Sequence, residues 1–197
     1  VECVFGKKGD DLPEDTGWWK GDYIISYLSP WIVPESLLER CKIAAINFHP
    51  ASPNYPGIGC TNFALYEEAK EYGATCHHMN TKVDTGNIIA VKRFPILPND
   101  NVHSLTQRTY DFQLVLFYEV LSKILNDKPL PISTEKWTRK SLTRTELNAL
   151  SVITPTMTKQ EIEKRVRATS YQNFQPIIEI HNHIFELKTT ENKSHSL

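Results

Sequence analysis

The chain has 197 residues, of which 40% are hydrophobic and 23% charged, and its formal net charge is −1. This length supports one sizeable core with a small appendage, and the balanced charge does not indicate a nucleic-acid partner. No apolar stretch approaches the roughly 20 residues of a membrane span, and no signal-peptide pattern stands at the start, so we predict a cytoplasmic protein without nucleic-acid or membrane partners.

Apolar runs bounded by turn residues predict strands over residues 1–5, 22–28, 43–49, 74–79 and 87–94. Helical spacing of apolar residues predicts helices over 34–41, 61–72 and 102–125, with Thr61 capping the second and Gly73 ending it. Strands and helices alternate up to about residue 126, which favours an α/β fold with a mostly parallel sheet.

The character of the chain changes after the long helix. We predict a catalytic core over residues 1–128 and a small α+β region over 129–197. The second region contains two short helical patterns, 145–150 and 159–168, and a terminal hairpin over 177–187.

The most informative local pattern is Asn47-Phe48-His49-Pro50, at the end of an apolar run. Side chains two apart on a strand point to one face, and Pro50 has no amide hydrogen to continue the pairing. Asn47 and His49 are therefore expected side by side at the carboxyl end of a strand, where open α/β sheets bind ligands.

A second polar turn, Asp84-Thr85-Gly86, follows the next predicted strand. An amide that polarises a carbonyl, an imidazole that accepts a proton and an aspartate that holds the imidazole would suit acyl transfer. Each pattern alone is ambiguous, because a histidine at a strand end is commonly an ordinary polar residue and Asp-Thr-Gly is commonly a simple turn.

Taken together, three blocks of the sequence resemble the folate-dependent formyltransferases: Asn47 to Pro50, Tyr55 to Cys60 and Val83 to Gly86. That family has an Asn-x-His motif and a later Asp in a turn that ends in Gly. The branch of nucleotide-sugar N-formyltransferases is similar over about residues 19–187. The segments that carry this wider similarity are Trp19 to Ser29, Tyr55 to Tyr66 and Arg167 to Thr169.

This resemblance implies a Rossmann-like fold and transfer of a formyl group from N10-formyltetrahydrofolate to a nucleotide-linked amino-dideoxy sugar, for which dTDP-4-amino-4,6-dideoxyglucose is our prediction. Asn47 would donate to the developing oxyanion and His49 would accept a proton from the amine. Asp84 would orient His49, stabilise its charged form or relay a proton to the departing folate nitrogen. The sugar chemistry suggests a role in surface-polysaccharide synthesis.

The resemblance also implies binding residues and a homodimer. Residues at two turns would border the folate, namely Leu28, Ser29, Pro30 and Val83. Tyr55, Pro56 and Gly57 would either contact the substrate or brace their loop.

A basic and aromatic set would meet a diphosphate or a nucleobase, or form a solvated face or a dimer contact; its members are Trp137, Arg139, Arg144, Arg165 and Arg167.

The histidine pair and the cysteines receive simpler interpretations. His77 and His78 point to opposite faces of a predicted strand, so one of them could face the site, but we interpret both as packing residues. The cysteines lack CxxC or zinc-ribbon spacing and no second ligand cluster follows Cys76, so we predict free thiols and no metal site. The four are Cys3, Cys41, Cys60 and Cys76.

Other acceptors and a non-enzymatic role are the alternatives. Methionyl-tRNA formyltransferase shares the three polar residues but carries a larger, basic C-terminal domain. Glycinamide ribonucleotide formyltransferase has a similar length but opens with a glycine-rich phosphate loop. The family sheet normally begins with a strand that precedes the equivalent of Val1, so we expect a longer natural protein, a shortened active form, or a truncated binder of folate or nucleotide sugar.

Overall fold

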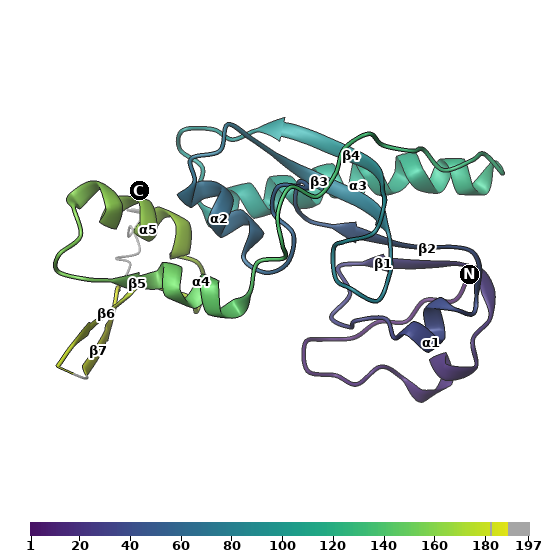
Figure 1. Ribbon diagram of the computed structural model, residues 1–197, viewed down its shortest axis with the longest axis horizontal. Helices are drawn as coiled ribbons and strands as arrows, with labels where there is room; N and C mark the ends of the chain where they lie inside the picture. Colours follow the sequence, from purple (N-terminus) through teal and green to yellow (C-terminus); the bar gives the residue numbers. More distant parts are fainter. Residues whose placement is uncertain (182, 189–197) are drawn as a thin grey trace, which may run out of the picture.

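The computed structural model describes residues 1–181 and 183–188, and it contains a central four-stranded sheet (Figure 1). Its strands lie in the order β1-β2-β3-β4. They are β1 (Gly21–Tyr27), β2 (Cys41–His49), β3 (Glu71–His78) and β4 (Ile88–Pro95). The pair β1 and β2 is parallel, whereas β2 with β3 and β3 with β4 are antiparallel.

The predicted α/β class is confirmed, but within this sheet the parallel pairing is confined to β1 and β2. The reason is the short connection after β2. Helix α2 (Cys60–Tyr66) has only 7 residues, about 10 Å of helix, which does not carry the chain back along the whole sheet. The chain therefore returns as an antiparallel strand, and a loop over residues 79–87 then joins β3 to β4.

The long helix α3 (Val102–Leu125) has the bounds that the sequence predicts, and it packs on β3 and β4. Asn101 begins it with a capping box, in which its side chain accepts from the Ser104 amide and the Ser104 hydroxyl accepts from the Asn101 amide. The remaining helices are the 3-10 helix η1 (Glu14–Trp18), α1 (Glu35–Leu38), α4 (Arg144–Ser151) and α5 (Lys159–Thr169).

A second sheet of three strands forms near the end of the described chain. Two strands, β6 (Ile177–Ile180) and β7 (His183–Glu186), make the predicted hairpin, with Asn182 outside the described residues. The third, β5 (Val152–Ile153), pairs in parallel with β6 and has no recognisable signal in the sequence because it is 2 residues long.

Three local predictions are wrong in detail. Residues 1–5 form no strand and are exposed to solvent. The strand predicted over 22–28 as buried is a half-buried edge strand, with Ile25 37% exposed. The second helix ends at Tyr66 rather than residue 72, and it is preceded by Gly59 in a left-handed conformation instead of being capped by Thr61.

The chain leaves α2 through Glu68, whose φ is 54°, and Tyr72 and Gly73 belong to β3 instead. Tyr72 is fully buried between the sheet and α3, and Gly73 lies inside β3 rather than after a helix. A Cβ atom at Gly73 would lie 2.5 Å from the carbonyl oxygen of Lys92 on β4, so the glycine permits close pairing of the two strands.

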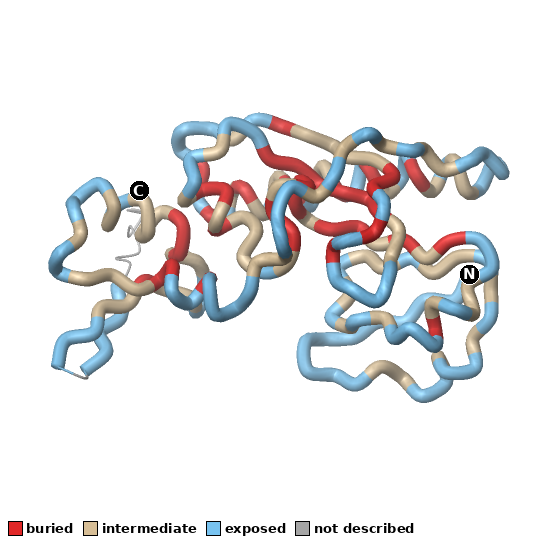
Figure 2. The backbone as a smooth tube through the Cα atoms, in the orientation of Figure 1, coloured by how far each residue is buried: buried red, intermediate tan, exposed pale blue. Residues whose placement is uncertain are grey.

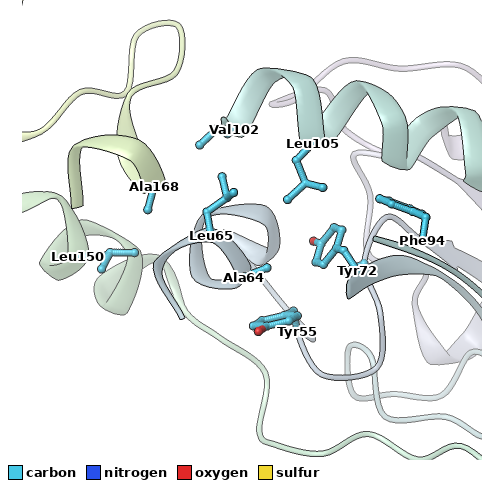
Figure 3. Packing of buried hydrophobic residues seen from close by; sticks show 10 residues of the cluster. Tyr55, Ala64, Leu65, Tyr72, Phe94, Val102, Leu105, Leu150 and Ala168 are labelled. Carbon is cyan, nitrogen blue, oxygen red and sulfur yellow. The ribbon is translucent and has the colours of Figure 1, made fainter. Parts of the chain in front are cut away.

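In the described part of the chain, most buried hydrophobic residues belong to two clusters, and the burial is concentrated in the middle of the molecule (Figure 2). One cluster lies between the sheet and α3 and includes Ile46, Phe48 and Leu116. In the other, shown in Figure 3, Leu150 of α4 and Ala168 of α5 join residues of α2, β3 and α3. Residues after 129 thus contribute to the same core as the residues before it.

No helix in the described part of the chain combines the length and the apolar character needed to cross a membrane.

The difference in burial between two positions of α3 predicts that truncating their side chains has different effects on stability. Leu105 is 0% exposed and Leu125 is 70% exposed. We expect Leu105→Ala to lower the free energy of unfolding by about 2–5 kcal/mol, because it removes buried methyl groups and leaves a cavity. Leu125→Ala is the matched control and should change it by less than about 0.5 kcal/mol. Urea titration followed by circular dichroism measures both, and equal effects would contradict the described packing.

Candidate active site

Asn47 and His49 occupy the end of β2, where the sheet and α3 hold the backbone firmly. The Gln113 side chain of α3 donates to the carbonyl of Phe48, between the two residues, at 2.7 Å. The Thr75 hydroxyl donates to the Ala51 carbonyl at 2.6 Å, which fixes the chain just beyond Pro50. The two-residue spacing places both polar side chains on one face, as predicted.

Asp84 reaches this face from the loop between β3 and β4. Its φ is 50°, a left-handed conformation that aspartate tolerates better than most residues. Gly86 allows the loop to lie close to β3, because a Cβ atom there would be 1.7 Å from the His78 carbonyl oxygen. The loop therefore delivers a carboxylate to the end of β2 across the strand between them.

The Asp84 carboxylate lies between two buried imidazoles. Its Oδ2 is 3.3 Å from His49 Nδ1 and its Oδ1 is 3.3 Å from His77 Nε2. The Gly57 amide also donates to Oδ2 at 2.8 Å. Asn47 completes the group, with its Nδ2 3.1 Å from His77 Nε2. The structure thus brings the three predicted catalytic residues together and adds His77, which directly opposes Asn47 across β2 and β3.

Backbone carbonyls restrict where the imidazole protons lie. His77 Nδ1 is 2.8 Å from the His78 carbonyl oxygen, which only accepts, so Nδ1 carries the proton. His49 Nε2 lies 2.9 Å from the Tyr55 carbonyl oxygen and its Nδ1 faces Asp84. A neutral His49 has one N–H for these two acceptors, so it donates to either Tyr55 or Asp84.

Burial and nearby polar groups shift the pKa values of His49 and Asp84 in opposite directions. Burial lowers the pKa of His49, although the Asp84 carboxylate and the Tyr55 carbonyl act to raise it. Burial acts to raise the pKa of Asp84, but its contacts with His77 and His49 and the hydrogen bond from the Gly57 amide together hold that pKa below its ordinary value. The favoured state has an ionised Asp84 beside a neutral His49.

The loop that contains Tyr55, Pro56 and Gly57 braces the site through its backbone. The Tyr55 carbonyl contacts His49, the Pro56 carbonyl accepts from the Leu142 amide at 2.8 Å, and the Gly57 amide holds Asp84. Gly57 has a φ of 91°, and a Cβ atom there would lie 2.3 Å from the Leu142 carbonyl oxygen. The bracing role that the sequence allowed for these residues is therefore visible in the structure.

Trp137 covers the two imidazoles from a segment far along the chain. Its ring meets His77 edge-on with centroids 5.0 Å apart and lies 5.8 Å from the His49 ring. Its Nε1–H donates to the Gly86 carbonyl at 2.8 Å. The sequence singled out Trp137 only as part of a basic and aromatic set, because nothing local indicates a contact with residues so distant in the chain.

The predicted folate-binding residues lie on two nearby segments. The β1–β2 register pairs Tyr27 with Phe48, so Leu28, Ser29 and Pro30 follow β1 next to the end of β2. Leu28 has a φ of 50° and is 45% exposed. Val83 directly precedes Asp84, and its carbonyl accepts from the Ser141 hydroxyl at 3.1 Å.

Three arginines of the predicted basic set have partners inside the molecule. Arg139 makes a bidentate pair with Glu67 at 2.7 and 2.8 Å. Arg165 donates to three backbone carbonyls at the end of α4, and Arg167 donates to the Asp100 carbonyl. In the described residues, no group of three His, Cys, Asp or Glu side chains is arranged to hold a metal ion.

A family model described as formyl transferase matches residues 18–121, which is more than half of the chain. The chain belongs to this family. A methionyl-tRNA formyltransferase from Dictyoglomus thermophilum is 30% identical over 66% of this chain and 38% of its own length. The chain therefore spans well under half of that relative.

Solved formyltransferases share the fold. A 4-N formyltransferase from Francisella tularensis superimposes with a TM-score of 0.73 at 21% identity, over 92% of this chain and 78% of that one. WlaRD, a sugar 3N-formyl transferase crystallised in the presence of dTDP and 5-N-formyl-THF, has a TM-score of 0.64 at 27% identity, over 80% of this chain and 57% of its own. The resemblance to the formyltransferases is thus confirmed at the level of family and fold.

The lowered pKa of His49 predicts a pH dependence of stability. Below about pH 6.5 the unfolded chain binds a proton that buried His49 resists, so the free energy of unfolding falls as the pH falls. We expect His49→Gln to reduce this slope between pH 7 and 5 by up to about 1.4 kcal/mol per pH unit. Urea unfolding at several pH values measures it. His103→Gln, at an exposed position of α3, should leave the slope unchanged, and an unchanged slope in His49→Gln would refute the assignment.

Proposed function

We propose that this protein transfers a formyl group from N10-formyltetrahydrofolate to the amine of a nucleotide-linked amino sugar, with dTDP-4-amino-4,6-dideoxyglucose as the specific acceptor. The observation that carries the proposal is the convergence of Asn47, His49 and Asp84 at the end of β2. Membership of the formyl transferase family and the likeness to WlaRD support it.

The residue chemistry suits attack of an amine on a formyl carbon. In the described residues the Asn47 side chain bonds only to His77, so its second N–H remains for the formyl oxygen, where negative charge develops. A new C–N bond forms between the amine and the formyl carbon, and the bond from that carbon to the folate nitrogen breaks. The amine loses one proton and the departing folate nitrogen gains one.

His49 can accept the amine proton only in one of its two neutral forms. With the ring proton on Nδ1, donated to Asp84, the Nε2 lone pair is available. In the structure Nε2 contacts the Tyr55 carbonyl, so this step requires Nε2 to exchange that carbonyl for the amine. Asp84 stabilises the resulting imidazolium by its charge, as the aspartate of a catalytic triad does.

Two segments near the end of β2 would bind the folate donor. Leu28, Ser29 and Pro30 lie beside the end of β2, and Val83 adjoins Asp84. These positions are consistent with folate binding through the backbone groups of the four residues. Tyr55, Pro56 and Gly57 would contact the acceptor while they brace the site, since the Tyr55 carbonyl already meets the catalytic nitrogen of His49.

A methionyl-tRNA acceptor is the second candidate, favoured by the relative from Dictyoglomus thermophilum. The two acceptors are separated by one assay. The protein is mixed with N10-formyltetrahydrofolate and a panel of amino sugars on dTDP, UDP and GDP, with methionyl-tRNA in a parallel sample. Mass spectrometry should show one added formyl group on a dTDP-linked amino sugar. Formylation of the tRNA alone would refute the sugar acceptor, and no product on any acceptor would refute the proposal.

Variants of the three polar residues test the mechanism. We expect Asn47→Ala to lower kcat by about two to three orders of magnitude through loss of the oxyanion donor. His49→Asn should lower it by about two to four orders through loss of the base, and Asp84→Asn should also impair turnover. Product formation by mass spectrometry measures these losses, and circular dichroism checks that the fold survives. His103→Gln is the matched control, and near-normal turnover in Asn47→Ala or His49→Asn would refute that residue's role.

A further inference from the structure

His77 makes more contacts to the candidate catalytic residues than a packing residue requires. Its side chain is 3% exposed and lies between Asn47 and Asp84. We propose that His77 is a positioning residue for formyl transfer, whose neutral ring accepts a hydrogen bond from the Asn47 amide and so fixes the direction of the remaining Asn47 N–H. The catalytic part of this inference rests on the proposed function.

The backbone of β3 determines which ring nitrogen is the acceptor. The 2.8 Å contact between Nδ1 and the His78 carbonyl requires a proton on Nδ1. A neutral His77 then has its only in-plane lone pair on Nε2, where the Asn47 amide nitrogen lies 3.1 Å away. Asp84 Oδ1, at 3.3 Å, is farther from Nε2 than Asn47 is.

Gly86 and Trp137 hold the imidazole in this orientation. The tight approach of Gly86 to the His78 carbonyl keeps the β3–β4 loop in place, and the nearest side-chain atom to a Cβ at Gly86 would be His77 Nδ1, at 3.6 Å. Trp137 packs edge-on against the His77 ring at an interplanar angle of 88°. The ring therefore has little freedom to turn its Nε2 away from Asn47.

The orientation matters because an amide has two different ends. If Nε2 accepts one Asn47 N–H, the second N–H and the carbonyl oxygen of that side chain point in fixed directions. An oxyanion donor is effective when it is oriented before the reaction begins. Without His77, Asn47 could turn its carbonyl oxygen toward the formyl oxygen, and the two oxygens would repel each other.

The proton position on His77 is tested directly, without any substrate. Long-range ¹H–¹⁵N spectra of the ¹⁵N-labelled protein at pH 7.5, assigned by comparison with His77→Gln, report which ring nitrogen carries a proton. We expect a protonated Nδ1 and an unprotonated Nε2. A proton on Nε2, in either the other neutral form or the imidazolium, would overturn the proposal. This result does not depend on the identity of the acceptor, so it distinguishes failure of this inference from failure of the proposed function.

Two variants test the positioning role. In His77→Gln an amide oxygen replaces the Nε2 acceptor, so kcat should remain within about tenfold of the wild type; in His77→Leu it should fall by about one hundredfold or more. KM for the sugar should change less than about threefold in both, because binding groups are untouched. His78→Gln, the same substitution on the next residue, is the control. Equal kcat in the Leu and wild-type proteins, or equal losses in Gln and Leu, would overturn the proposal.

Discussion

The arrangement of the site depends on one buried carboxylate. Asp84 is 5% exposed and meets His49, His77 and the Gly57 amide within 3.3 Å. An ionised carboxylate with so little solvent requires hydrogen-bond donors such as the Gly57 amide, because removal from water alone would raise its pKa and neutralise it. The same contacts connect β2, β3 and the loop that contains Gly57. The Asp84 charge, which suits acyl transfer, therefore also holds these segments together.

The C-terminal segment completes this site as well as the core. Trp137 packs on both imidazoles, and the Leu142 amide and carbonyl pair with Pro56 and Ile58 across the site loop. Farther on, Leu150 and Ala168 pack against α2. The boundary that the sequence suggests near residue 128 is thus a change in composition across which both the buried core and the site continue.

Local sequence patterns predicted the structural features that depend on residues close together in the chain. The α3 bounds follow from its apolar period, and the common face of Asn47 and His49 follows from the strand period. The role of His77 was missed because it depends on the register that pairs it with Asn47, which no spacing in the sequence encodes. The length of α2 was overestimated for a similar reason, since Tyr72 is buried under α3 and belongs to β3.

Recognition of the proposed nucleotide sugar would use groups other than the internally paired arginines. Arg165 satisfies the carbonyl end of α4, and Arg139 pairs with Glu67 while lying 5.0 Å over the Tyr55 ring. A diphosphate could bind Arg139 only by displacing a bidentate carboxylate of similar geometry, which would cancel much of the gain. Release of Glu67 would also disturb Tyr55, whose hydroxyl donates to that carboxylate and whose carbonyl meets His49. Charge recognition at Arg139 would therefore be coupled to the state of the His49 imidazole, whereas backbone groups near Leu28 and Val83 could bind a ligand without that penalty.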